Sequence, residues 1–468
     1  MADAKKYDLL LTGGKVFVGG KLRKFDIAIK GEKIAALGHR LNVTAGRRIK
    51  LAGKIVLPGA IDAHVHFQLP VGRIISIDDF SSGSVAAACG GITTFIDFAI
   101  QKKGQSLLEA IKNRRMQADG RVAIDYSLHA VPTDWTPRTV AEFAEAVKQG
   151  ITSFKIYLIY KEQGVYSNDA ALYAALETAA RAGGLITVHA ESADLLDYFV
   201  KRYHTESAMK RYGAYAHFLS RPAIVEVEAV NRAVLFAGHA GGRLYIVHMS
   251  AKDSVSTVRR ARRNGVFVFA ETCPHYLVYT EAVLRGGDGY LYATAPQIKT
   301  KKDQDALWRG LADGTISVIA TDDCGFSRKQ KSSWRGDFTK IPCGLSGVET
   351  MLPLIYTYGV RTGRISLNRM VQALSTNPAK LFGLYPKKGI IAVDADADLA
   401  IIDPERKTVL SAKSLHSRCD WSPYEGKTVW GVPEITISRG KIIVLDGEFV
   451  GSTGHGKFLK RRPPAPAV

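Results

Sequence analysis

The spacing of apolar and polar positions divides the 468-residue chain into three parts. Between about residues 55 and 324, short runs rich in β-branched residues alternate with segments of helical periodicity, which is typical of βα units around a parallel sheet. The helical patterns at 139–150 and 168–184 end in glycine, as helices commonly do. The strand-like runs cover residues 55–67, 93–100, 122–131, 152–160, 185–192, 243–250, 266–273 and 317–324. Eight of them predict an α/β fold with a (β/α)8 TIM barrel, although a doubly wound open sheet would use the same elements.

Both ends of the chain have a different pattern, in which short strands alternate with glycine turns. Residues 7–38 and 389–450 show it, and each part alone has too few strands to bury a core. We therefore expect a second, smaller β-sandwich domain built from both termini. The predicted boundaries are 1–58 and 380–450 for the two parts of the sandwich, 59–379 for the barrel, and 451–468 for a C-terminal tail that is either an oligomer arm or disordered.

Composition restricts the class of protein further. The hydrophobic fraction of 46% and the charged fraction of 23% are ordinary for a soluble globular protein. No apolar run approaches the roughly 18 to 20 residues of a membrane helix, and the first ten residues lack a signal-peptide core, so we expect a cytoplasmic protein. Five cysteines without a CxxC pair suggest neither a disulfide framework nor a thiolate zinc site.

The formal net charge of +20 raises the question of nucleic-acid binding. Residues 258–265 and 457–468 are strongly basic, but no nucleic-acid-binding motif accompanies them. Solvated helix faces and a mobile tail explain them more simply, and we predict no nucleic-acid or membrane partner. The excess charge could still steer anionic ligands.

Candidate chemistry lies at the ends of the predicted strands. His64 and His66 are two residues apart, so both imidazoles point to the same side of a strand. Alone, such a pair is more often two hydrogen-bonded histidines. Lys155 lies within an apolar strand, where a lysine must find a partner, lose its proton or be modified.

Further polar residues end other strands, at the face where barrel enzymes assemble their active sites. They are His189, His248 and Asp322. Nitrogen and oxygen ligands without thiolate suit zinc, manganese, cobalt or nickel. The six candidates exceed the three protein ligands of one catalytic zinc, so two metal ions are predicted.

Eight ordered motifs resemble the dihydropyrimidinase and hydantoinase branch of the cyclic amidohydrolase superfamily. They are "PGAIDAHVHF", "DDFSSGSVAAACGGITTFIDF", "SFKIYLIY", "TVHAES", "YIVHMS", "ETCPHYL", "ATDDC" and "NPAKLFGLYPKKG". The resemblance runs from near the N-terminus to about residue 460, and it is more specific for the superfamily than for a substrate. It implies a metal-dependent hydrolase with two divalent ions per subunit, Zn²⁺ first, with Mn²⁺, Co²⁺ or Ni²⁺ as alternatives. It also implies a homo-oligomer, a dimer or a tetramer.

The same resemblance assigns roles to the candidate residues. His64, His66 and Asp322 would hold one ion, His189 and His248 the other, and carbamylated Lys155 would bridge them. A lysine paired with Asp322 and a Schiff-base lysine are the alternatives.

The implied reaction is hydrolysis of a ring amide by a hydroxide held between the metals. Asp322 would take the hydroxide proton and return it to the leaving nitrogen, which makes it the general base and then the general acid. Tyr160 would stabilise the oxyanion, although a tyrosine at a strand end is more often a packing residue. The expected substrates are 5-substituted hydantoins or dihydropyrimidines, which open to N-carbamoyl amino acids.

Departures from the family pattern concern the substrate. Asp323 stands where histidine is usual, Cys343 replaces the asparagine of "IPNG", and Ala295 replaces a serine. The last two positions hold the ring edge through backbone groups in the family, so the contacts survive the side-chain change. Gln68 occupies the place of the dihydroorotase arginine, which favours a substrate without an obligatory carboxylate.

The pocket wall for the exocyclic substituent is predicted from apolar residues after the first and fourth strands. The candidates are Phe67, Leu69, Val71, Tyr157 and Leu158. Alternatives to the hydantoinase hypothesis are an allantoinase, a cyclic imide hydrolase, or a non-enzymatic assembly homologue. Retention of all six ligand positions argues against the last.

Overall fold

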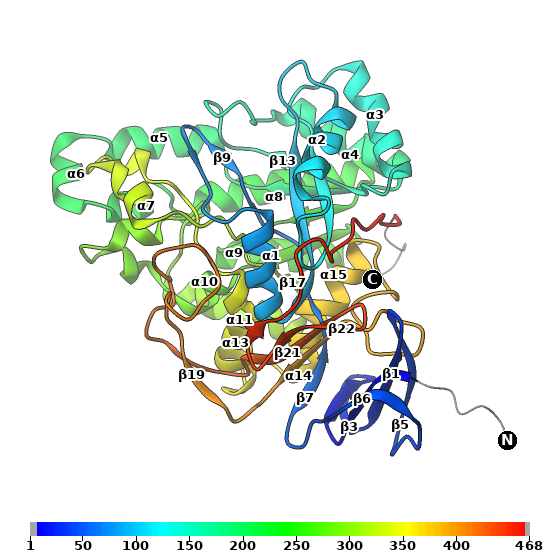
Figure 1. Cartoon of the computed structure of the whole chain (residues 1–468). Helices are drawn as coiled ribbons and strands as arrows, with labels where there is room; N and C mark the ends of the chain where they lie inside the picture. Colours follow the sequence, from blue (N-terminus) through cyan, green and yellow to red (C-terminus); the bar gives the residue numbers. More distant parts are fainter. Residues whose placement is uncertain (1–6, 464–468) are drawn as a thin grey trace.

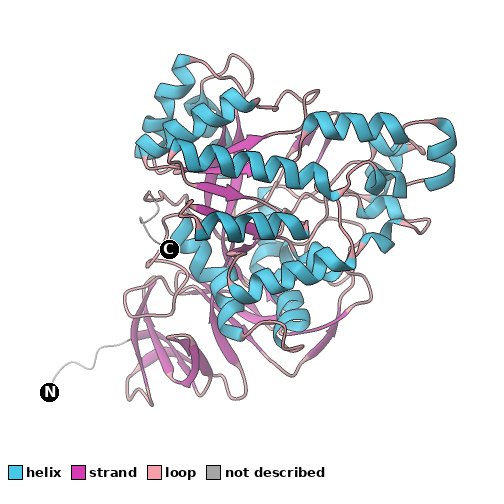
Figure 2. Ribbon diagram, turned by 180° about the vertical axis from the view of Figure 1, so that it is seen from behind, coloured by secondary structure: helices cyan, strands magenta, loops and turns pink. Residues whose placement is uncertain are grey.

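Eight parallel strands form the central sheet of the computed structural model, which describes residues 7–463. They follow one another in chain order, and helices surround them (Figures 1 and 2). The strands are β8 (Ala60–Asp62), β11 (Ile92–Ile100), β12 (Asp125–Val131), β13 (Ser153–Tyr157), β14 (Leu185–His189), β15 (Leu244–Ile246), β16 (Val268–Thr272) and β17 (Val318–Ile319). The His66 N–H donates to the Asp323 carbonyl at 2.8 Å, which joins the segments after β8 and β17. The predicted (β/α)8 barrel is confirmed.

The first predicted strand is divided between two sheets, which the sequence did not reveal. Residues 55–58 form β7 (Ile55–Pro58) outside the barrel, and the chain enters the barrel as β8 after Gly59. A Cβ atom on Gly59 would lie 2.2 Å from the Thr93 side chain, so only glycine fits this crossing. A continuous apolar run does not record a change of sheet, because both sheets bury it.

Helices cover the outside of the barrel. The long ones are α1 (Phe80–Cys89), α2 (Leu107–Ala118), α3 (Pro137–Lys148), α4 (Asp169–Ala182), α5 (Ala193–Tyr203), α8 (Ala223–Ala240), α9 (Lys252–Arg263) and α11 (Lys301–Asp313). Shorter ones are α6 (Glu206–Tyr212), α7 (Tyr215–Leu219), α10 (Pro274–Val278), α12 (Arg328–Lys331), α13 (Met351–Ile355), α14 (Leu367–Val371) and α15 (Asn377–Leu381). Helix α4 begins at the Asn168 side-chain cap and ends at Gly183, whose φ of 76° is left-handed. In Figure 1, α5, α6 and α7 extend at the end of the molecule opposite the N-terminal strands.

The N-terminal and C-terminal strands form two sheets that share one core. One sheet contains β1 (Tyr7–Thr12), β4 (Asp26–Lys30), β5 (Lys33–Gly38) and β6 (Ala45–Lys50). The other contains β2 (Lys15–Val18), β3 (Lys21–Lys24), β7, β18 (Leu399–Ile402), β21 (Pro433–Ser438), β22 (Lys441–Leu445) and β23 (Glu448–Phe449). Leu9 and Ile29 of the first sheet pack with Val56, Ile401 and Ile437 of the second. This is the discontinuous β-sandwich expected from the two ends.

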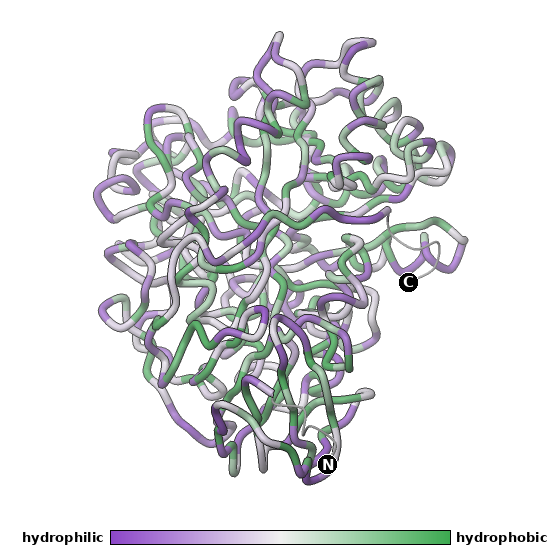
Figure 3. The backbone as a smooth tube through the Cα atoms, turned by 45° about the vertical axis from the view of Figure 1, so that its right-hand side comes forward, coloured by the Kyte–Doolittle hydropathy of each residue, from purple (hydrophilic) through white to green (hydrophobic). Residues whose placement is uncertain are grey.

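Two small antiparallel pairs complete the strands, β9 (Pro70–Val71) with β10 (Ile74–Ile75) and β19 (Lys407–Val409) with β20 (Thr428–Trp430). Hydrophobic residues recur along the interior segments, and hydrophilic residues collect in peripheral turns and helix faces (Figure 3). Within residues 7–463, no helix combines the length and the hydropathy needed to cross a membrane.

The described part of the C-terminal tail lies against the barrel of its own chain. The Leu459 N–H donates to the Tyr126 carbonyl at 2.7 Å, and the Arg461 N–H donates to the Gly150 carbonyl at 3.0 Å. The Arg461 guanidinium is buried and donates to Ser153 Oγ at 2.8 Å, and burial lowers its pKa to about 9. The expectation of a mobile basic tail is therefore wrong for residues 457–463, and residues 464–468 lie outside the described part.

Candidate metal centre and substrate site

Four buried histidines gather at the carboxyl ends of three barrel strands. His64 and His66 follow β8, His189 ends β14, and His248 follows β15. The ring centroids of His64 and His66 are 5.1 Å apart, those of His64 and His248 are 5.4 Å apart, and those of His189 and His248 are 4.4 Å apart. The structure thus brings all four predicted histidines into one cluster.

Asp322 enters this cluster from the segment after β17. Its Oδ1 lies 3.2 Å from His64 Nε2 and 3.3 Å from His66 Nε2, so three potential ligand atoms converge on one point. The backbone is turned to achieve this, because Asp322 and His248 have φ angles of 53° and 36°. Non-glycine residues rarely adopt such angles, and they concentrate at functional sites.

Lys155 lies beneath the histidines in β13 and is fully buried. Its Nζ is 5.2 Å from the ring centroid of Phe98 and 5.0 Å from that of Tyr157, and within residues 7–463 it has no hydrogen-bond partner. Burial lowers the lysine pKa to about 8, although the Asp322 and Glu271 carboxylates oppose the shift. A substantial fraction of the amine is therefore neutral near pH 8.

Several nitrogen atoms of the cluster are buried without a partner in the described part of the chain. His64 Nε2, His66 Nδ1, His248 Nδ1 and Lys155 Nζ have this property. Buried polar atoms are normally hydrogen-bonded, and leaving one unsatisfied costs about 1–3 kcal/mol. Four such atoms beside a carboxylate fit divalent metal ions, whose coordination would satisfy them.

Two further carboxylates orient the histidines, and the sequence analysis did not assign them. Glu271 of β16 accepts from His64 Nδ1 at 2.8 Å, from the His248 N–H at 3.0 Å and from the Tyr245 hydroxyl at 2.8 Å. Burial raises the Glu271 pKa to about 8. The sequence feature that could have indicated Glu271 is a carboxylate inside an apolar strand, just as Lys155 is a charged residue inside an apolar strand.

Glu191 does the same for His189. It accepts from His189 Nε2 at 2.8 Å and from the Arg221 guanidinium at 2.9 and 3.0 Å. Burial opposes ionisation of Glu191, but Arg221 and His189 overcome it and lower the carboxyl pKa. Carboxylates that hold the far nitrogen of a ligating histidine fix its tautomer and orientation.

Tyr160 lies at the rim of this cluster, beside His189. Its ring centroid is 5.3 Å from that of His189, and its φ of 69° turns it out of the line of β13. Burial, followed by the neighbouring Cys343 thiol, raises the tyrosine pKa well above its usual value. The phenol therefore stays protonated and can donate a hydrogen bond.

The segments that contain Ala295 and Cys343 meet at His217. His217 Nε2 lies 3.0 Å from the carbonyl oxygen of Thr294 and 3.8 Å from Cys343 Sγ. Cys343 is half-buried, and Ala295 is buried. Both predicted ring-binding segments thus lie close together.

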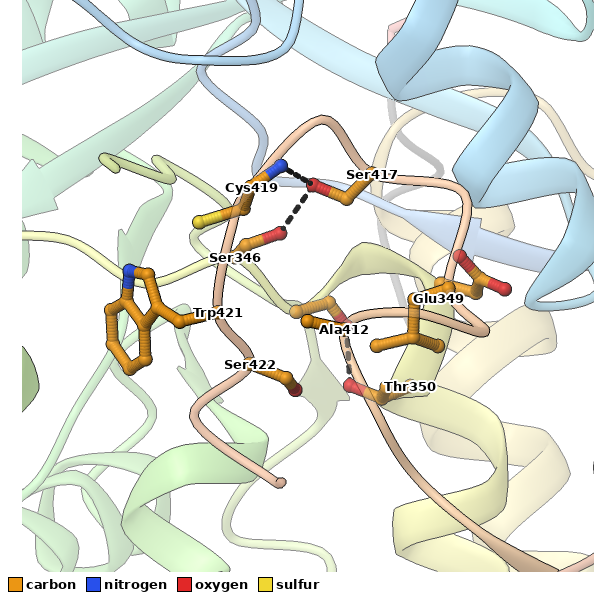
Figure 4. Close-up of a pocket in the computed structure, with 10 residues that line it drawn as sticks. Ser346, Glu349, Thr350, Ala412, Ser417, Cys419, Trp421 and Ser422 are labelled. Atoms are coloured by element: carbon orange, nitrogen blue, oxygen red, sulfur yellow. Dashed lines mark hydrogen bonds between the residues drawn. The ribbon is translucent and has the colours of Figure 1, made fainter. Parts of the chain in front are cut away.

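Asp323 points away from the cluster into a loop. Its Oδ2 accepts from the Gly347 N–H at 2.6 Å and from the Val348 N–H at 2.9 Å, and burial followed by repulsion from Asp78 raises its pKa to about 7. A small cavity lies behind this loop, where Ser346 and Ser417 share a 3.0 Å hydrogen bond (Figure 4). The carboxylate that replaces the usual histidine therefore ties down the loop after β17.

The five residues predicted for the apolar wall lie in different surroundings. Phe67 and Leu158 belong to the main hydrophobic core, where the Phe67 ring lies 5.2 Å from that of Phe95. Tyr157 is also buried, under Tyr160. Leu69 and Val71 lie on the partly exposed segment of the β9–β10 hairpin.

Comparison with known proteins defines the class of this site. Residues 55–443 match the model of the amidohydrolase family, and the chain belongs to that family. It is 39% identical to a D-hydantoinase of Geobacillus stearothermophilus over 460 residues, which are 97% of this chain and 96% of the relative. It is 40% identical to a D-hydantoinase of Ralstonia pickettii over 458 residues, which are 97% and 99% of the two chains.

A solved structure places the chain more narrowly. The dihydropyrimidinase from Brevibacillus agri NCHU1002 superimposes with a TM-score of 0.95 at 37% identity, covering 97% of this chain and 99% of that one. The resemblance inferred from the sequence motifs, to the hydantoinase and dihydropyrimidinase branch, is confirmed.

Proposed function

We propose that this protein hydrolyses the ring amide of 5-substituted hydantoins or dihydropyrimidines to N-carbamoyl amino acids. The observation that carries the proposal is the cluster of His64, His66, His248, Lys155 and Asp322, in which four buried nitrogens lack hydrogen-bond partners within residues 7–463. The relatives named D-hydantoinase support the D-enantiomer as the preferred hydantoin.

The donor set supports two divalent ions, Zn²⁺ by preference, with His64, His66 and Asp322 on one side and His189 and His248 on the other. Such ions supply a hydroxide nucleophile near neutral pH. Lys155 between them is proposed to be carbamylated. Its neutral amine forms an N–C bond with carbon dioxide and releases one proton, and the lowered lysine pKa supplies that amine.

The side chains around the ions have separate tasks. Asp322 accepts the proton of the nucleophile and donates it to the ring nitrogen as the amide bond breaks. Tyr160 donates its hydroxyl hydrogen to the carbonyl oxygen as negative charge develops there. Backbone groups of Ala295 and Cys343 hold the ring edge. Gln68 stands in place of an arginine and cannot form a bidentate ion pair with a substrate carboxylate.

We also propose a homo-oligomer in a reducing compartment such as the cytoplasm. All five cysteines are unpaired, which supports the compartment. Native mass measurement tests the oligomer.

The central experiment is a turnover panel with metal analysis. Purified protein is assayed against dihydrouracil, aryl- and alkyl-hydantoin enantiomers, allantoin, dihydroorotate and cyclic imides, before and after chelation. We expect hydantoin opening that chelation abolishes and divalent metal restores. Highest turnover of allantoin or a cyclic imide would replace the proposed substrate, and a metal-replete protein inert towards all of them would support the assembly homologue.

A matched pair of lysine variants tests the bridge. Lys155→Ala is expected to lose bound metal and turnover. Lys331 is also fully buried with a pKa lowered to about 8, but its Nζ faces the Ala293 carbonyl, so Lys331→Ala should keep the metal content. Full metal occupancy in Lys155→Ala would refute the bridging role.

A further inference from the structure

A second group of metal-ligating side chains lies outside the site described above. Cys89 ends α1, Glu349 lies in the short 3₁₀ helix Val348–Thr350, and His416 lies in the loop between β19 and β20. One donor atom from each, the thiol sulfur, a carboxylate oxygen and an imidazole nitrogen, lies within 4.8 Å of the other two. Three segments distant in the sequence therefore place different donors around one point.

Two contacts hold Glu349 and His416 against each other at this point. The His416 N–H donates to Glu349 Oε2 at 2.7 Å and fixes the carboxylate, while Glu349 Oε1 lies 2.9 Å from His416 Nδ1. The other imidazole nitrogen, Nε2, lies 3.8 Å from the carboxylate of Glu448. A histidine whose far nitrogen meets a carboxylate is the usual arrangement of a metal ligand.

The thiol is held beside Glu349 by close backbone packing. A Cβ atom on Gly90 would lie 2.6 Å from the Glu349 carbonyl oxygen, so glycine permits the approach of the two segments. Cys89 is buried, and within residues 7–463 its thiol makes no hydrogen bond. In Figure 4 the Glu349 carboxylate points away from the hydroxyl groups of Ser422 and Thr350.

The dimensions fit one small transition-metal ion. Zinc binds sulfur at about 2.3 Å and nitrogen or oxygen at about 2.0–2.2 Å, so donors on one tetrahedral ion lie about 3.5 Å apart. The observed spread of at most 4.8 Å requires a movement on the order of 1 Å. The side chains of His416 and Glu349 are 22% and 12% exposed, which gives an ion access from solvent.

We propose that Cys89, Glu349 and His416 form a third metal site that binds Zn²⁺ or a similar thiophilic divalent ion, apart from the metal centre in the barrel mouth. The thiol loses its proton as sulfur binds the ion, and water completes the coordination. The ion would join the end of α1 to the loop after β17 and to the loop between β19 and β20. We assign it a structural role, because it would connect three segments that are distant in the sequence.

Cobalt loading of the full-length chain tests the site, because only thiolate ligands give a sulfur-to-cobalt charge-transfer band in the near ultraviolet. Chelated protein is titrated with Co²⁺ while the band and the bound cobalt per chain are measured. We expect the band in wild type, and in Cys89→Ser its loss together with one equivalent of cobalt, with hydantoin turnover retained. Cys419→Ser is the matched control, since Cys419 is also buried but its thiol donates to the Phe326 carbonyl.

Two further variants keep the outcome decisive. His416→Gln should also bind one equivalent of cobalt less than wild type. This variant tests the site even if Cys89→Ser folds poorly. Lys155→Ala should keep the band although it loses the ions of the barrel, so the two metal proposals fail independently. Absence of the band in wild type, or its persistence in Cys89→Ser, would overturn the third site and leave an ordinary Glu349–His416 ion pair beside a buried thiol.

Discussion

Glu271 offers a sharp test of the proposed metal centre in the barrel. The carboxylate takes three donors on two oxygens: Oε1 accepts from His64 Nδ1 and the His248 N–H, and Oε2 accepts from the Tyr245 hydroxyl. In Glu271→Gln the amide can keep its oxygen toward the histidines and turn its NH₂ toward Tyr245, whose hydroxyl then becomes the acceptor. The bond to His64 survives, but the variant lacks the negative charge that Glu271 gains above its pKa of about 8 or beside bound metal ions, and that charge makes the imidazole a stronger ligand.

The expected magnitude follows from this geometry. Loss of an outer carboxylate weakens metal binding by about 10- to 100-fold. Because the bond to His64 persists, Glu271→Gln should weaken metal binding by about tenfold, or about 1.4 kcal/mol. Glu271→Ala removes the acceptor for both histidines and should approach the upper limit of about 100-fold, or about 2.8 kcal/mol.

The assay is a competition titration of metal-free protein with Zn²⁺ against a chromophoric chelator. Tyr245→Phe is the control, since it removes the donor on Oε2 and leaves both histidine contacts intact, so less than about threefold weakening is expected. Wild-type affinity in Glu271→Ala would refute the reasoning, because the histidines would then be oriented by packing alone.

Three other changes have defined outcomes. Tyr160→Phe should lower kcat by about 10²- to 10³-fold with metal content unchanged, measured by turnover and metal analysis; unaltered kcat would remove the tyrosine from the mechanism. The folded protein keeps the Asp323 proton up to a pKa of about 7, whereas the unfolded chain loses it near 3.8, so stability falls as pH rises between these values. In metal-free protein, the free energy of unfolding of Asp323→Asn, measured by urea denaturation, should therefore rise relative to wild type between pH 5 and pH 8, by at most about 4 kcal/mol. A difference between variant and wild type that stays constant from pH 5 to 8 would contradict this. Arg461→Ala should lower the free energy of unfolding by about 2–3 kcal/mol, since it leaves Ser153 and the Leu128 carbonyl without their charged donor, while exposed Lys460→Ala should not.

The barrel and its six candidate residues were accessible from the sequence because both depend on local periodicity. Each strand is an apolar run, and each candidate except Lys155 stands where a run ends, so the fold alone brings them to one face. Lys155 was conspicuous since a charge in a buried strand contradicts its surroundings.

What the sequence did not show depends on contacts between distant segments. Glu271 and Glu191 act through bonds to histidines in other strands, and no spacing rule connects them. In the sequence, Arg461 belongs to a basic tail, and only the structure shows that its side chain is buried against Ser153 of the barrel. Cys89 and His416 are 327 positions apart, so a spacing test for metal ligands does not connect them.

The pairing of β7 with β18 has a consequence for synthesis on the ribosome. Ile55 lies opposite Ile402, so the partner of β7 is translated 347 residues later. At about 5–20 residues per second, that interval lasts roughly 17 to 70 s. Throughout it, β7 lacks its neighbour β18, and its exposed edge can pair with other nascent chains. The β-sandwich is therefore the part of this protein that most needs chaperone protection during translation, and a ribosome that stalls before residue 399 leaves a chain that cannot complete it.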